Sequence, residues 1–248
     1  MYAVFQCLRK DFVMSLPTVN KSEKLKKTLT LLILCVLVPA VVLIGALVFG
    51  SRSYAWISLC VVVLSIVPFF MRFEKSSLDV KRLVLIAALV ALSVVGRMAF
   101  AAVPGFKPVA ALVIITAVHF GGEAGFMVGA LSALLSNFYF GQGPWTPFQM
   151  FSWGIVGLIA GLLAPVLKKH LVALCAYGAL AGGLYSLLMD VWSTLWADGY
   201  FNIRRYLGFV VSSASFTLVY AVSNVIFLLV CAYPLGKVLE RLKTKFGI

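Results

Sequence analysis

Apolar residues follow one another along this chain in blocks of about twenty, and only short polar breaks separate the blocks. Such blocks exceed what a helix in a soluble core needs, and a bilayer core about 30 Å thick takes roughly 20 residues of helix. A barrel would instead show alternating strands of about ten residues. The pattern therefore predicts an all-α polytopic membrane protein with eight spans, at residues 29–50, 54–71, 83–103, 108–120, 124–140, 148–167, 171–196 and 209–235.

The polar loop MRFEKSSLDVKR, residues 71–82, divides the predicted helices into two groups. A basic N-terminus, residues 1–28, precedes a two-helix transmembrane hairpin at 29–80, which we interpret as accessory. Residues 81–248 form the six-helix remainder, whose spans are rich in Gly, Ala and Ser. Because small residues let helix backbones approach closely in lipid, we expect this six-helix domain to be the functional body.

Lysine and arginine are distributed unevenly between the two sides of the predicted topology. Eight spans put both termini on one side, which holds sixteen of the 21 basic residues. The other side holds four: Arg52, Lys107, Arg204 and Arg205. The positive-inside rule then predicts that both termini are cytoplasmic, in a multi-pass cell membrane protein of a prokaryote. The net charge of +13 is explained by this topology, so we expect the bilayer as a partner and no nucleic acid.

Motifs for catalysis or for a resident cofactor are missing from the sequence. No GxxxxGK[ST] segment could hold ATP phosphates, and the two histidines belong to no zinc motif. The five cysteines show no paired spacing, and no nucleophile motif stands out. We therefore expect no enzyme activity, no catalytic residue, no cofactor and no metal site.

Two charged residues fall inside predicted spans at similar depth. Arg97, in VVGRMAF, and Asp190, in LLMDVW, both lie toward the non-cytoplasmic side. An unpaired charge at this depth costs several kcal/mol, of the order of 3–5. Either both residues line a ligand cavity that opens outward, or they neutralise each other between helices.

The segment FGQGPWTPFQ, residues 140–149, interrupts the apolar pattern on the predicted outer face. Its glycines and prolines indicate an irregular turn, which membrane proteins tolerate only around protein or a water-filled cavity. Gln142, Trp145, Phe148 and Gln149 offer flat apolar faces and amide groups, the mixture expected of a small-molecule pocket. The alternative is an interfacial aromatic belt around a tight turn.

The last outer segment, DVWSTLWADGYFNIRRYLG at residues 190–208, has a similar composition. Trp192, Trp196 and Tyr200 extend the aromatic surface, although belt anchoring again explains some of them. Two aromatic and polar segments on one face predict an external binding site with a lid.

These residues identify a family. RLVLIAALVALSVVGRMAF at 82–100, followed by the segment from Lys107 to Leu163 that contains GPWTPFQM, resembles the S component of energy-coupling factor (ECF) vitamin transporters. The S component is the substrate-binding membrane subunit of these importers. The resemblance covers about residues 80–243, and the N-terminal hairpin is an addition to the usual six helices.

The resemblance implies partners and a mode of action. In this family an AxxxA pattern on the first core helix packs against a transmembrane coupling subunit, which is joined to two cytosolic ATPases. Ala87 and Ala91 match that pattern, although packing within the bundle would explain the same spacing. The ATPases of this ECF module would supply the missing phosphate-binding loops.

The whole pattern, including the extra hairpin, is most similar to cobalamin-specific S components, which implies cobalamin as the ligand. A flavin or another vitamin would also suit an outer site with many aromatic residues. A hypothesis of a different class is a stand-alone ion-coupled transporter that uses Arg97, Asp190 and Glu123.

Overall fold

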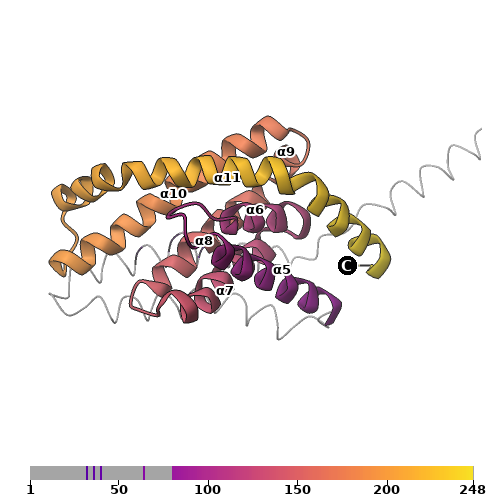
Figure 1. Ribbon diagram of the computed structural model, residues 1–248, viewed down its shortest axis with the longest axis horizontal. Helices are drawn as coiled ribbons and strands as arrows, with labels where there is room; N and C mark the ends of the chain where they lie inside the picture. Colours follow the sequence, from indigo (N-terminus) through magenta and orange to yellow (C-terminus); the bar gives the residue numbers. More distant parts are fainter. Residues whose placement is uncertain (1–31, 33–35, 37–39, 41–63, 65–79, 248) are drawn as a thin grey trace, which may run out of the picture.

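The structure of the protein is a computed structural model, shown in Figure 1, and it describes residues 80–247 together with Leu32, Val36, Ala40 and Leu64. The predicted N-terminal segment 1–28 lies outside the described residues. So does nearly all of the predicted hairpin 29–80. The count of eight spans therefore stays a prediction.

The described part of the chain forms seven helices and no strand. Three of the helices are long and apolar enough to cross a membrane, and two shorter ones are also apolar. The all-helical membrane fold is thus confirmed. The elements are α5 (Val80–Ala99), α6 (Val109–Phe120), α7 (Gly122–Phe140), α8 (Thr146–Leu162), α9 (Ala164–Leu167), α10 (Leu171–Asp198) and α11 (Ile203–Phe246).

Each of the six predicted spans from residue 83 onward corresponds to a helix, but several ends differ, most of all that of α11, which continues to Phe246 instead of ending at residue 235. Helix α5 stops at Ala99 because a run of turns follows it. The predicted span 148–167 is divided into α8 and the four-residue α9, which has a proline in its first turn. Helix α11 begins earlier than predicted because the Asn202 side chain caps it by accepting from the N–H groups of Arg204 and Arg205.

Glycines bring neighbouring helices into backbone contact. A Cβ atom on Gly157 of α8 would lie 2.4 Å from the carbonyl carbon of Gly125 on α7. A Cβ atom on Gly182 of α10 would lie 2.7 Å from the Ala221 nitrogen on α11. The expectation that small residues permit close helix packing in this part of the chain is therefore confirmed.

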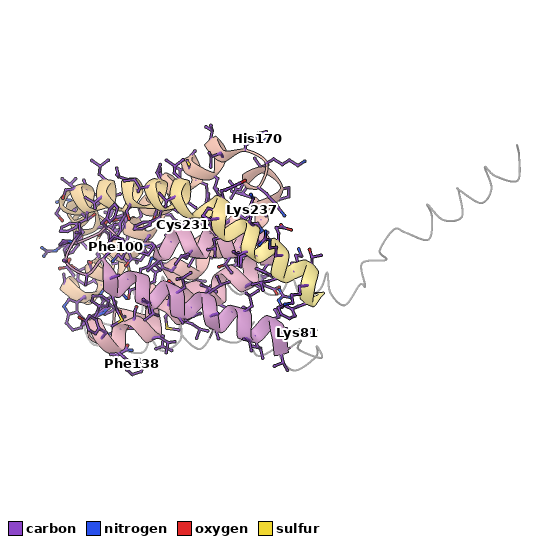
Figure 2. The ribbon with its side chains drawn as sticks, turned by 45° about the vertical axis from the view of Figure 1, so that its right-hand side comes forward. Lys81, Phe100, Phe138, His170, Cys231 and Lys237 are labelled. Carbon is purple, nitrogen blue, oxygen red and sulfur yellow. The ribbon has the colours of Figure 1, made fainter. Side chains whose placement is uncertain are left out.

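The bundle has two distinct ends. The α7–α8 and α10–α11 turns lie toward the left of Figure 1, whereas α9 and the C-terminus lie toward the right. Figure 2 places Phe100 and Phe138 toward the left end, and Lys81, His170 and Lys237 toward the right. Following the predicted topology, we call the left end the outer end and the right end the inner end.

Candidate functional site

Arg97 lies in the last turn of α5, where its side chain is buried and 9% exposed. Its Nη1 donates to Ser136 Oγ and, at 2.9 Å, to Asn137 Oδ1, both on α7. Both partners are neutral, so these bonds hold the guanidinium in place without cancelling its charge. Because Nη1 makes both bonds, the other donors of the guanidinium remain available.

A chain of amide hydrogen bonds extends from Arg97 across the outer end. Asn137 Nδ2 donates to Thr146 Oγ1 at 2.9 Å and to Gln149 Oε1 at 2.8 Å, both on α8. Gln149 Nε2 then donates to the Tyr185 hydroxyl on α10 at 3.0 Å. Four helices are connected through this chain, and its side chains are fixed because each amide uses both of its ends.

Aromatic rings surround the polar chain and contact two cations. The Arg97 guanidinium carbon lies 4.5 Å from the Phe140 ring centre and 5.1 Å from that of Trp153. The Lys107 ammonium lies 5.8 Å from the Trp153 centre and 4.9 Å from that of Tyr220. The negative faces of the rings attract both cations but carry no net charge.

Lys107 is held in the loop between α5 and α6 by its backbone. Its N–H donates to Ser223 Oγ at 2.9 Å, and Ser223 Oγ donates back to the Lys107 carbonyl at 3.1 Å. Burial and the nearby charge of Arg97 lower the pKa of the Lys107 ammonium from 10.5 to about 7. This ammonium makes no hydrogen bond or ion pair with any residue in 80–247.

A small pocket lies beside these groups, and its cavity volume of ≈ 10 Å³ is about that needed for one water molecule. Binding pockets for drug-sized ligands measure about 300–1,000 Å³, so a vitamin could enter here only if the surrounding side chains moved apart. We call it the outer pocket. It is lined by Lys107, Val109, Ala110, Trp153, Gly182, Tyr185, Tyr220 and Asn224.

Arg97 and Asp190 do not neutralise each other. The Asp190 carboxylate accepts from Ser213 Oγ at 2.7 Å, and no ion pair joins it to Arg97 in the described structure. The interpretation of these two charges as an interhelical pair is therefore wrong. Their predicted role toward a ligand stays a prediction.

The other predicted site residues separate into three groups. Gln142 closes the turn after α7, because it donates to the Leu134 carbonyl at 2.8 Å and accepts from Thr146 Oγ1 at 3.0 Å. Phe148, Trp192 and Trp196 form a row of rings with centres 5.3 and 5.5 Å apart. Trp145 and Tyr200 are 38% and 52% exposed, respectively.

Of the predicted residues, Arg97 and Gln149 lie within the polar chain beside the outer pocket, and Gln142 is joined to it through Thr146. Several side chains near Arg97 and Gln149 in this chain were not among the predicted site residues. Asn137 and Tyr185 carried a signal, because each is a polar side chain within an otherwise apolar helix. We call the complete set the cationic cluster: Arg97, Lys107, Asn137, Gln149, Trp153, Tyr185 and Tyr220.

Ala87 and Ala91 lie on the exposed side of α5, whereas Ile86, Leu89 and Val90 face the bundle. Packing of the two alanines within the described bundle is therefore not observed. Both alanines are exposed with respect to the described residues, and the docking role stays a prediction. Among the described residues, no group of three or more His, Cys, Asp and Glu side chains could hold a metal ion.

The fold and the cluster together define a class: a helical membrane protein with a polar and aromatic cluster at one end. Residues 77–241 match the family described as the S component of the ECF-type riboflavin transporter, and the chain belongs to this family. It is therefore a multi-pass membrane component of a vitamin transport system rather than a member of an enzyme family. The predicted S-component resemblance is confirmed at this level.

A curated relative and the solved structures add to this comparison. The chain is similar to UPF0397 protein VSAL_I1988 of Aliivibrio salmonicida (strain LFI1238), with 29% identity over 150 residues. The match covers 58% of this chain and 79% of the relative. No solved structure matches the chain.

Proposed function

We propose that this protein is the substrate-binding subunit of an ECF-type importer, which binds a vitamin at the outer end of its six-helix domain. The observation that carries the proposal is the buried cationic cluster beside the outer pocket, in a chain of the S-component family. In this proposal both termini are cytoplasmic, and an ECF module provides the coupling subunit and the two ATPases that hydrolyse ATP.

The family match and the ring geometry favour a flat ring system of flavin size. Trp153 and Tyr185 are stacked with centres 5.3 Å apart and planes 15° apart, and both line the outer pocket. An aromatic ligand gains about 0.5–1.5 kcal/mol per ring contact beyond its buried area. A flavin, riboflavin or its phosphate ester, is therefore the first candidate.

Cobalamin is the second candidate. Trp145, Trp196 and Tyr200 carry exposed rings, which a bulky corrinoid could cover. These exposed rings are the observation that favours cobalamin, whereas the family match favours riboflavin.

Binding to the isolated subunit tests the proposed site. The full chain is purified in detergent and titrated by calorimetry with riboflavin and with cobalamin, and its absorption spectrum is recorded for co-purified ligand. We expect one-to-one binding of one vitamin, weakened by Gln149→Leu. No binding of any vitamin in a wider panel, by a folded sample, would refute the proposal.

Cellular uptake tests the docking surface. Replacing Ala87 or Ala91 with Trp should abolish uptake and leave binding unchanged, because a bulky ring prevents close approach of a partner helix. Leu180→Trp is the matched control, since Leu180 is 72% exposed on α10 and should tolerate the ring. Uptake in cells that lack an ECF module would instead support a stand-alone ion-coupled transporter.

A further inference from the structure

A buried cation, Arg97, and a half-buried one, Lys107, lie close together at the outer end without an acidic partner in residues 80–247. Arg97 and Lys107 share the ring of Trp153, and Arg97 is close enough to lower the pKa of the Lys107 ammonium. Like charges in a poorly solvated site repel each other. The empty site is therefore electrostatically unfavourable, and neutral hydrogen-bond partners relieve only part of this cost.

The acidic residues of the described chain are all placed elsewhere. Residues 80–247 contain four carboxylates. Asp190 accepts from Ser213, Asp198 pairs with Arg205, and Glu240 contacts Lys168 and His119. Glu123 lies in the first turn of α7, at the end of that helix opposite Ser136 and Asn137. No carboxylate in this part of the chain neutralises the pair.

Both cations lie near the ring of Trp153, and both have donors that bond no residue in 80–247. The Lys107 ammonium lines the outer pocket and has three unused N–H groups. Arg97 does not line the pocket, but it bonds its neighbours through Nη1 alone, so its other N–H groups remain available. An anion that accepted from both cations would supply the missing negative charge.

We propose that the ligand carries an anionic group, a carboxylate or a phosphate, which binds to both Arg97 and Lys107 while its uncharged remainder contacts Trp153 and Tyr220. This inference rests on the proposed function and names the substrate class of the same site. Charge-assisted hydrogen bonds are about twice as strong as neutral ones, so the anionic group supplies both affinity and orientation. Riboflavin lacks such a group, whereas its phosphate ester carries one.

Matched pairs of ligands test the proposal. The full-length subunit in detergent is titrated by calorimetry at pH 6.5 with riboflavin and flavin mononucleotide, which differ by a phosphate. It is also titrated with pantothenol and pantothenate, which differ by a carboxylate. We expect the anionic member of at least one pair to bind at least about tenfold more tightly than its neutral counterpart. The pair that shows the preference identifies the anion.

Three variants show whether the two cations cause the preference. Lys107→Met should remove most of it, and Lys107→Arg should retain it because the charge remains. Lys169→Met removes an exposed lysine at the inner end and should change nothing. Thermal unfolding of each empty variant shows that it is folded. Removal of an uncompensated buried charge is expected to leave the melting temperature of Lys107→Met equal or higher.

The possible outcomes separate this inference from the proposed function. If a neutral vitamin binds as tightly as its anionic counterpart, the anion site is refuted while vitamin binding stands. An anion preference that persists in Lys107→Met and in Arg97→Met would also refute it. If no member of either pair and no vitamin of the panel binds, the proposed function fails and the anion site fails with it.

Discussion

The two ends of the bundle hold their cations in opposite ways. At the inner end, Glu240 contacts both Lys168 and His119, and the Lys168 and Glu240 side chains are 50% and 45% exposed. At the outer end, Arg97 and Lys107 are surrounded by amides, hydroxyls and rings. The inner charges are compensated by the protein and by water. No carboxylate among residues 80–247 compensates the outer charges.

This difference indicates where the molecule is built for stability and where it is built for binding. An exposed ion pair contributes about 0–1 kcal/mol, so breaking the Glu240 contacts at the inner end should change the stability of the protein little. Buried cations without a carboxylate lower the stability of the empty protein, and such destabilised sites are common where a ligand binds. The comparison can be tested by giving the outer end the carboxylate that the inner end has.

The substitution with the largest expected effect is Asn137→Asp. Asn137 Oδ1 already accepts from Arg97 at 2.9 Å, so a carboxylate at this position would neutralise the guanidinium. We expect an anionic ligand to bind about 100-fold more weakly or worse, while the empty protein melts a few degrees higher. Calorimetric titration and thermal unfolding measure the two effects.

Asn137→Leu is the control for this substitution, because it removes the same hydrogen bonds to Thr146 and Gln149 without adding a charge. It should lower the melting temperature, since Thr146 and Gln149 are buried and lose the hydrogen bonds that Asn137 donates to them. An equal loss of affinity in both variants, with no stabilisation in Asn137→Asp, would mean that the hydrogen-bond geometry rather than the charge controls binding.

Glycine substitutions compare the packing of the two ends. A Cβ atom on Gly182, which lines the outer pocket, would lie 2.7 Å from backbone of α11. Gly182→Ala should cost about 1–3 kcal/mol of stability and weaken ligand binding, because α10 and α11 must separate. At the inner end, a Cβ atom on Gly236 would meet only the His119 side chain, at 3.1 Å. Gly236→Ala should therefore cost less.

Gly183→Ala is the matched control, because nothing lies within 4 Å of a Cβ atom at that position. Chemical or thermal unfolding in detergent ranks the three variants. The expected order of destabilisation is Gly182→Ala, then Gly236→Ala, then Gly183→Ala. A large effect of Gly183→Ala would show that helix propensity or an uncharacterised contact, rather than the α10–α11 approach, dominates.

The affinity for an anionic ligand should depend on pH at the outer end. The pKa of Lys107 is about 7 in the empty protein, and a bound anion raises it. Binding above pH 7 therefore takes up a proton, and the Kd should rise about tenfold per pH unit there. The groups that surround this ammonium are Arg97, which stays charged, and the phenols of Tyr185 and Tyr220, which are neutral in this range.

Titrations with a carboxylate ligand between pH 6.5 and 8.5 measure this dependence, because a carboxylate remains ionised throughout. Lys107→Arg is the control and should give a nearly constant Kd. The affinity for the ligand should thus fall as the pH rises, whereas the stability of the ligand-free protein should increase. Above pH 7 the folded Lys107 loses its proton while the unfolded chain keeps it, so stability rises with pH.

Helix placement was largely predictable from the sequence, because hydropathy reports directly on a bilayer. The errors lie at ends where local chemistry decides. Pro165 separates α9 from α8 inside one apolar block, and Asn202 begins α11 six residues before its apolar run. Such capping signals are short, and a hydropathy window of about twenty residues averages them away.

The binding site was predictable only in part. The GPWTPFQ segment lies at the same end of the bundle as the cationic cluster, and Gln149 belongs to that cluster. The sequence left open whether Arg97 and Asp190 pair or line a ligand cavity, because both are charges at similar depth and depth does not fix the direction of a side chain. Lys107 was counted only for topology, since its burial depends on how the α5–α6 loop folds against Ser223 of α11.

The smallest effect is expected at the inner end, from Glu240→Gln. This change removes the charge that Lys168 and His119 contact, but the side chain is 45% exposed and water replaces the interaction. We expect less than about 1 kcal/mol of destabilisation and no change in ligand affinity. Salt titration of the melting temperature checks the result, since screening should reduce the difference between the variant and the native protein. A loss of affinity comparable to that of Asn137→Asp would mean that the two ends are coupled and that the compensated inner charges also support binding.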